Sequence, residues 1–277
     1  MKKNLISLAV ILLCTAAGAQ TITLDKYETV YKDDNVTFRK LDDNTWLGSG
    51  NLMSSESLYL MAGKKKAILI DAGTTIPGLD KIASDIAQKP VTLVLTHVHP
   101  DHAGAVGCFD EVWISPADTV NIPAFMNDYT GKVRFLKNGQ KFRLGGRVLQ
   151  AYFTPGHTPG SVTFLEKGTD TGYCGDAFGT GNDGNTGGIL VFTDMETIIK
   201  TCQDSYEYFS RKGYRKLYCG HFYGDNFVTM ARLKRVEAEA TDILNGKLTG
   251  SPIDGYFGLN RRAESNGFSI RYIDRGN

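Results

Sequence analysis

The side chains best suited to chemistry are concentrated in one short segment of this 277-residue chain. The segment reads THVHPDHAG and directly follows an apolar run at residues 91–95. His97 and His99 are two positions apart, so both imidazoles can point to the same side. Asp101 and His102 follow one turn later, where the chain enters a helix. Four potential ligands so close together cannot all address one tetrahedral metal ion, but they can serve two neighbouring ions.

Three further potential ligands follow later apolar runs. They are His157 in TPGHTPG, Asp176 in CGD and His221 in CGH, and in each case Gly or Pro lets the backbone bend beside the ligand. Histidine and carboxylate donors suit Zn²⁺, Fe²⁺ or Mn²⁺ better than Ca²⁺ or Mg²⁺. All five histidines of the sequence belong to this set. A metal site therefore explains them better than five unrelated structural roles.

The elements that must position these residues alternate between strands and helices, which favours a layered α/β architecture. Two hairpins are expected first, then amphipathic helices between short apolar strands, with a capping box at TDME before one helix. The predicted strands cover residues 36–41, 46–47, 58–61, 67–70, 91–95, 149–153 and 217–219, and the predicted helices cover residues 79–86, 198–209 and 230–244.

The composition is that of an ordinary globular protein, with 42% hydrophobic and 22% charged residues. A formal net charge of +1 provides no field for holding nucleic acid. No Pro- or Ser-rich linker and no fixed-period repeat interrupts the chain. We therefore expect residues 20–277 to form one domain that acts on a small molecule.

The first 19 residues have the form of a secretory signal peptide. Lys2 and Lys3 precede an apolar run at residues 5–13, and Ala17-Gly18-Ala19 is a small-residue cleavage pattern that leaves Gln20 as the new N-terminus. The apolar run is too short for a membrane anchor, and no later segment could span a bilayer. Leu13 argues against lipidation of Cys14. The mature protein is therefore expected in the periplasm or outside the cell.

Export permits disulfide bonds, and four cysteines lie outside the predicted signal peptide. Cys174 and Cys219 each precede a candidate ligand by two residues, so a disulfide between them is conceivable. Burial as small apolar core residues is the simpler interpretation for both.

Together, the ordered ligands and the Asp71-Ala72-Gly73 turn resemble the metallo-β-lactamase-fold superfamily over residues 35–245. The resemblance implies a four-layer αβ/βα sandwich, with two mixed β-sheets face to face and helices on the outer faces. It also implies that the metals lie in a cleft at one sheet edge.

The resemblance further implies how the ligands divide between two zinc ions, with Fe²⁺ or Mn²⁺ as alternatives. Asp176 bridges the two ions and Asp71 orients a ligand imidazole, although a strand-end turn explains Asp71 equally well. The first ion takes His97, His99 and His157, and the second takes Asp101, His102 and His221.

A dinuclear centre of this kind predicts hydrolysis. A metal-bridging hydroxide attacks an ester, thioester, lactone, amide or phosphodiester bond, and Asp101 takes part in proton transfer to the leaving group. Asp101 and Asp176 are therefore the predicted catalytic residues.

Departures from individual subfamilies narrow the activity. Asp176 disfavours β-lactamase activity, because β-lactamases of this fold generally lack an aspartate at that position. Gly179 stands where the acyl-homoserine lactonases carry a tyrosine, and only 56 residues follow His221, too few for the glutathione-binding extension of glyoxalase II. Flavin-linked di-iron members have Glu where His99 stands. A mononuclear iron sulfur dioxygenase remains an alternative, and a non-catalytic protein is disfavoured by the complete ligand set.

Three other features have ordinary alternatives. The glycine-rich residues 179–188 are either a wall of the cleft or a plain flexible loop. Tyr223 and Trp46 could face a substrate, but packing is the simpler expectation for both.

Overall fold

The computed structural model describes residues 23–52, 54–181 and 187–274. The predicted signal peptide, and residues 182–186 of the glycine-rich stretch, lie outside the described residues. Within the described part, no helix is both long and apolar enough to cross a membrane.

The first sheet contains eight strands in sequence order and is antiparallel from β1 to β5 and parallel from β5 to β8. Side chains of β4 and β5 are buried on both faces: Leu58 and Leu60 belong to a cluster with α1, whereas Tyr59 and Met61 face the second sheet. The strands are β1 (Thr29–Lys32), β2 (Val36–Asp42), β3 (Thr45–Gly50), β4 (Ser57–Ala62), β5 (Ala67–Ile70), β6 (Val91–Val94), β7 (Glu111–Ile114) and β8 (Lys132–Phe135).

The second sheet has the order β14-β12-β11-β10-β9, with only the β12–β14 pair parallel. Its strands β10, β12 and β14 therefore run in the same direction, and their carboxyl ends meet at one edge. The strands are β9 (Lys141–Arg143), β10 (Val148–Phe153), β11 (Val162–Glu166), β12 (Thr171–Gly175) and β14 (Lys216–Cys219).

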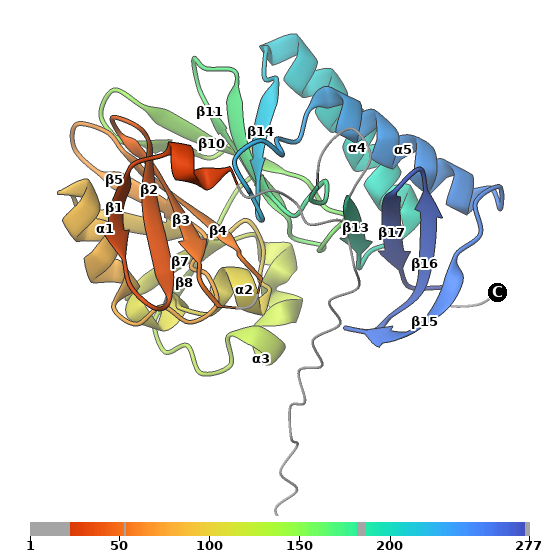
Figure 1. Cartoon of the computed structure of the whole chain (residues 1–277), viewed down its shortest axis with the longest axis horizontal. Helices are drawn as coiled ribbons and strands as arrows, with labels where there is room; N and C mark the ends of the chain where they lie inside the picture. Colours follow the sequence, from red (N-terminus) through yellow and green to blue (C-terminus); the bar gives the residue numbers. More distant parts are fainter. Residues whose placement is uncertain (1–22, 53, 182–186, 275–277) are drawn as a thin grey trace, which may run out of the picture.

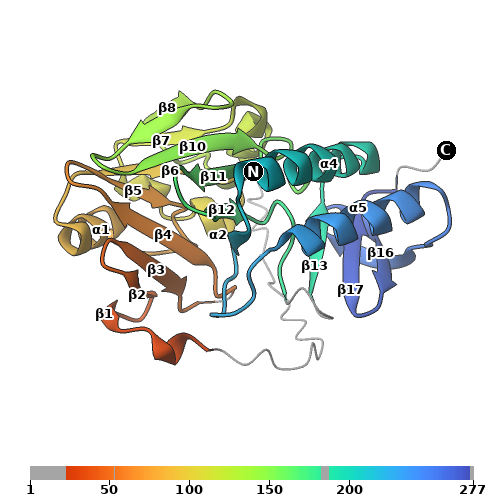
Figure 2. The ribbon, with the colours of Figure 1, turned by 90° about the horizontal axis from the view of Figure 1, so that it is seen from above.

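Helices cover the outer faces of these two sheets, and α1 and the pair α4/α5 lie on opposite sides of the molecule (Figures 1 and 2). The core between the sheets continues beneath α4 and α5, while α1 packs on the first sheet. The expected αβ/βα sandwich is confirmed. The helices are α1 (Leu79–Ala87), α2 (Pro100–Ala103), α3 (Ile122–Phe125), α4 (Met195–Lys212) and α5 (Met230–Leu244), with 3₁₀ turns η1 (Leu24–Lys26), η2 (Val106–Cys108) and η3 (Pro116–Asn121).

A third, four-stranded sheet was not predicted. It has the order β13-β17-β16-β15 and joins a strand from the middle of the chain to the last three. Figure 1 shows it below α4 and α5, at the end of the molecule away from α1. The strands are β13 (Gly187–Val191), β15 (Ser251–Tyr256), β16 (Leu259–Ser265) and β17 (Phe268–Tyr272).

The predicted hairpins, strands and helices all occur, but the predicted capping box is wrong by one residue. Asp194 is the N-cap of α4, and its carboxylate accepts a hydrogen bond from the Thr197 amide at 2.7 Å. The hydroxyl of Thr193 instead donates to the Gly156 carbonyl at 2.9 Å. A tertiary contact to the loop before His157 therefore displaces the local capping interaction.

The cysteines of the described residues are all free thiols, so Cys174 and Cys219 form no disulfide. Both are buried in the core, as the simpler interpretation expected. Burial raises the pKa of both thiols, which keeps them protonated and unreactive.

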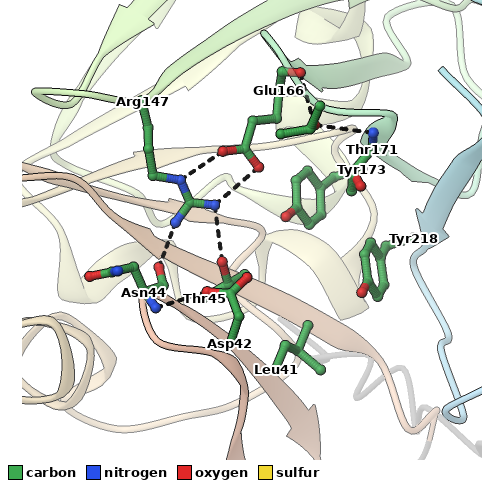
Figure 3. Close-up of a pocket in the computed structure, with 10 residues that line it drawn as sticks. Leu41, Asp42, Asn44, Thr45, Arg147, Glu166, Thr171, Tyr173 and Tyr218 are labelled. Atoms are coloured by element: carbon green, nitrogen blue, oxygen red, sulfur yellow. Dashed lines mark hydrogen bonds and ion pairs between the residues drawn. The ribbon is translucent and has the colours of Figure 1, made fainter. Parts of the chain in front are cut away.

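Arg147 precedes β10, whereas the candidate ligand His157 follows it, and the Arg147 side chain clamps the two large sheets together (Figure 3). Its Nε and Nη2 donate to the two carboxylate oxygens of Glu166 at 2.7 and 3.0 Å. It also donates to the carbonyl of Asn44 in the β2–β3 turn, to the carbonyl of Ala62 on β4 and to the Thr45 hydroxyl on β3. Because these bonds use all three nitrogens of the guanidinium, Arg147 has a structural role.

We predict that Arg147→Gln lowers the free energy of unfolding by about 3 kcal/mol, because the mostly buried Glu166 carboxylate loses its partner. Urea denaturation measures this change. The matched control is Arg143→Gln at an exposed position of β9, where the expected change is within about 0.5 kcal/mol. Equal effects of the two substitutions would contradict the clamp.

Candidate metal centre

The seven predicted ligands all follow the carboxyl ends of strands that meet at one edge of the sandwich. His97 and His99 lie in the loop after β6, and Asp101 and His102 lie on α2. The other three follow strands of the second sheet: His157 comes after β10, Asp176 after β12 and His221 after β14. The fold brings all seven side chains together.

The first group consists of His97, His99 and His157. The Nε2 atom of His157 lies 3.2 Å from Nε2 of His97 and 3.0 Å from Nδ1 of His99. Since Nδ1 of His157 lies 2.8 Å from the Leu190 carbonyl, which can only accept, this nitrogen carries the proton. The Nε2 lone pair of His157 therefore points at the other two imidazoles, as in a three-histidine metal site.

The second group consists of Asp101, His102 and His221. An Asp101 carboxylate oxygen lies 3.8 Å from Nε2 of His102 and 3.4 Å from Nε2 of His221. Nδ1 of His221 donates to the Ser54 carbonyl at 2.9 Å, which directs its Nε2 inward.

Asp176 lies between the two groups. Its Oδ2 atom is 3.8 Å from Nε2 of His157 and 3.4 Å from Nε2 of His221, and its Oδ1 atom is 3.8 Å from Nε2 of His102. Gly220 makes room for this carboxylate, because a side chain there would collide with it. The position is that of a residue able to bridge two ions.

Two buried atoms of this cluster support cation binding. His102 Nε2 and Asp176 Oδ1 have no hydrogen-bond partner among the described residues. The two atoms are 3.8 Å apart, which is too far for a hydrogen bond between them, whether or not His102 Nε2 carries a proton. Buried polar atoms left unsatisfied are costly, and a coordinated cation would satisfy both.

The pKa values of the histidines differ between the three-histidine group and the group of Asp101, His102 and His221. Burial, together with His157 and His102, lowers the pKa of His99 to about 3, and burial likewise lowers the pKa of His97 and His157. Burial opposes protonation of His102, but Asp101 and Asp71 outweigh it and raise its pKa to about 10. Three neutral imidazoles thus lie beside a half of the site that favours positive charge.

Burial also opposes protonation of His221, yet the charge of Asp176 raises its pKa to about 9. For Asp176 itself, burial disfavours the charged form, but the neighbouring His221 and His102 hold the pKa of the carboxyl well below its usual range. Asp176 is therefore ionised, as a metal-bridging ligand must be.

Asp71 orients one ligand, which the sequence left undecided. Its carboxylate accepts hydrogen bonds from Nδ1 of His102 at 2.9 Å, from the Thr96 amide at 2.7 Å and from the Thr96 hydroxyl at 2.8 Å. The backbone φ of Asp71 is +65°, a strained value for a residue with a side chain. These three bonds hold β5, the loop after β6 and α2 in one arrangement.

Two supporting carboxylates were missed by sequence reasoning. Asp118 accepts from the Val98 amide at 2.6 Å and from the Gly160 amide at 3.0 Å, so it joins the loops that carry the three-histidine group. Buried Glu56 accepts from the Thr74 amide at 2.8 Å and from the Ser54 hydroxyl at 3.0 Å, which steadies the segment bonded to His221. For Asp118 the only sequence signal is its position shortly after an apolar strand.

A cleft of about 510 Å³ opens beside the cluster, lined on one side by His157, Asp176 and His221. Its opposite wall comes from the third sheet and from described residues of the glycine-rich stretch, among them Gly179 and Gly188. Neither Trp46 nor Tyr223 is among the described residues that line it. Trp46 packs near α1 instead.

Comparison with known protein families shows to which superfamily the chain belongs. The sequence profile of the Metallo-beta-lactamase superfamily matches residues 54–221, which is more than half of the chain. The chain belongs to this superfamily. The relatives described below are named as a hydrolase and a thioesterase. The chain is a metal-dependent hydrolase of the metallo-beta-lactamase superfamily.

Similarity to individual members is low. Human (Homo sapiens) acyl-coenzyme A thioesterase MBLAC2 is 25% identical over 205 residues, covering 60% of this chain and 72% of that protein. Hydroxyacylglutathione hydrolase of Xylella fastidiosa is 32% identical over 117 residues, covering 42% of this chain and 43% of that protein. A solved metallo-beta-lactamase from Pontibacter korlensis superposes with a TM-score of 0.60 at 18% identity, over 75% of this chain and 99% of that one, and shows the shared fold.

We predict that Asp71→Asn weakens the binding of a divalent metal ion by about 10- to 100-fold, because an amide cannot accept from all three of its donors. Competition with a chromogenic chelator measures the affinity, and circular dichroism checks the fold. The control is Asp85→Asn, an exposed position on α1. Unchanged affinity in a folded Asp71→Asn protein would show that the carboxylate does not orient His102.

Proposed function

We propose that the chain is an exported, dinuclear zinc-dependent hydrolase that cleaves an ester or thioester of a small molecule. The observation that carries this proposal is the meeting of two ligand groups at Asp176. His97, His99 and His157 supply three nitrogen donors, and Asp101, His102 and His221 supply a second set. Nitrogen and carboxylate donors of this kind favour zinc.

The ions would supply a nucleophile at neutral pH and polarise the scissile carbonyl. The protein's own residues do the positioning. Asp176 would hold the two ions at a fixed separation, and Asp71 would fix the ring of His102. Asp101, whose side chain is 26% exposed, is placed to receive a proton and pass it to the leaving group.

A thioester is the bond that we favour, because the human relative is named as a thioesterase. β-Lactamase activity is the second candidate and shares the predicted export. The presence of Asp176 between the ligand groups weighs against it, and the similarity to solved β-lactamases supports the fold alone.

We expect the purified protein to contain about two zinc ions per chain by elemental analysis, and to hydrolyse a thioester faster than a chromogenic cephalosporin, a lactone or bis(4-nitrophenyl) phosphate. Asp176→Asn should lower the zinc content and reduce kcat/KM by more than about 100-fold, because the bridging charge is lost. One iron per chain, with oxygen consumption on a persulfide, would instead establish a sulfur dioxygenase. Full activity of Asp176→Asn would refute the bridging role.

Export is tested by expressing the full chain in a bacterium with an intact secretion pathway. We expect the protein recovered from the periplasm or the medium to begin at Gln20, because Ala17 and Ala19 form the small-residue cleavage pattern. N-terminal sequencing determines the first residue. Replacing Ala19 with a bulky residue should block processing, and recovery of an unprocessed chain in the cytoplasm of wild-type cells would contradict export.

A further inference from the structure

The third sheet presents two arginines to the cleft that also contains the candidate ligands. Arg262 of β16 and Arg271 of β17 line this cleft together with His157, Asp176 and His221. Both arginines lie beyond residues 54–221, the part of the chain that matches the family. The family match therefore does not include them.

Strand register explains why both arginines face the cleft. Arg262 and Arg271 are directly opposite each other in the antiparallel β16–β17 pair, and Leu190 of β13 is opposite Arg271. The intervening residues Phe268 and Ile270 point the other way, into the core beneath α5. Side chains of a strand alternate between its faces, so β17 turns Phe268 and Ile270 to the core and Arg271 to the cleft.

The arrangement concentrates positive charge. Like charges directly opposite each other on neighbouring strands destabilise a sheet. Glu264 offsets part of this charge, since it accepts a hydrogen bond from Nη2 of Arg262 at 2.6 Å. The Nε atom of Arg262 is nevertheless buried without a hydrogen-bond partner among the described residues. Among the described residues of the third sheet that line the cleft, the charged side chains are two guanidinium groups and one carboxylate.

The arginine wall is coupled to the ligand cluster through β13. The Leu190 carbonyl accepts the Nδ1 proton of His157 at 2.8 Å, and the Leu190 position pairs with Arg271 in the sheet. A group bound by the arginines would thus lie in the same cleft as the scissile bond, at a position fixed by backbone hydrogen bonds.

We propose that Arg262 and Arg271 form an anion subsite, so that this hydrolase selects substrates with a carboxylate or phosphate group near the scissile bond. The selection of substrates rests on the proposed hydrolase function, whereas the binding of an anion does not. A guanidinium offers parallel N–H donors that match the oxygens of either anion. Charge-assisted hydrogen bonds of this type correspond to about 10- to 100-fold in kcat/KM.

Matched thioesters test the selectivity of the zinc-loaded enzyme. S-acetyl-N-acetylcysteine differs from S-acetyl-N-acetylcysteamine by one carboxylate, and S-acetyl-4′-phosphopantetheine differs from S-acetylpantetheine by one phosphate. We expect the anionic member of at least one pair to be favoured by about 10-fold or more in kcat/KM. The pair that shows the preference identifies the anion.

Variants assign the preference to the subsite. Arg262→Gln and Arg271→Gln should each lower the ratio of kcat/KM for the anionic thioester to kcat/KM for the neutral one, and Glu264→Gln should raise this ratio. The matched control is Arg261→Gln, because Arg261 lies on the opposite face of β16 and pairs with Asp274 at 3.0 Å. Hydrolysis of neutral and anionic thioesters at equal rates by the wild type would overturn the subsite while leaving the hydrolase intact.

A binding measurement separates the subsite from catalysis. In the zinc-loaded full-length protein, titration with propionate or methyl phosphate should produce a saturable shift of the Arg262 Nε–H NMR signal, assigned through Arg262→Gln. The Arg147 signal, at the far end of the sandwich, should not move. A shift without thioester turnover would retain the subsite and refute only the thioesterase assignment, and an unmoved Arg262 signal would refute the subsite.

Discussion

The candidate centre depends on the orientation of its buried imidazoles, and for three of them a hydrogen bond to the second nitrogen sets that orientation. Three different acceptors do this for His102, His157 and His221: the Asp71 carboxylate and the carbonyls of Leu190 and Ser54. Each acceptor belongs to a different part of the fold. The site is therefore assembled only when the first sheet, the third sheet and the loop before β4 have all reached their places.

This constraint also explains why polar side chains outside the ligand set are buried. Asp118 accepts from backbone amides of the two loops that carry His97, His99 and His157. Glu56 accepts from the hydroxyl of Ser54, whose carbonyl accepts from His221. Burial raises the pKa of Asp118, because taking the carboxylate out of water is costly. The hydrogen bonds that it accepts offset that cost and make the ligand loops rigid.

The ligands and most elements were predictable because their signals are local. Histidines beside Gly and Pro after apolar runs mark strand ends, and helical spacing marks α1, α4 and α5. The third sheet was not predictable, because β13 pairs with β17 across a long stretch of chain and neither strand specifies its partner locally. The roles of Asp118, Arg262 and Thr193 likewise depend on contacts with residues that are distant in the sequence. Their identities carry no signal that separates them from ordinary surface residues.

The parallel pairing of β13 with β17 has a consequence for the order in which the protein is made. All seven candidate ligands, the last of them His221, are synthesised before residues 268–272, which form β17. β13 has no neighbour in its own sheet until that final strand emerges, because β17 is its sole strand partner among the described elements. A growing chain thus contains every ligand before it contains the strand that anchors β13, which carries the Leu190 carbonyl that orients His157. The strand that completes the substrate-binding wall is synthesised last. A chain that ends before β17 therefore retains every candidate ligand but lacks Arg271 and the strand that anchors β13.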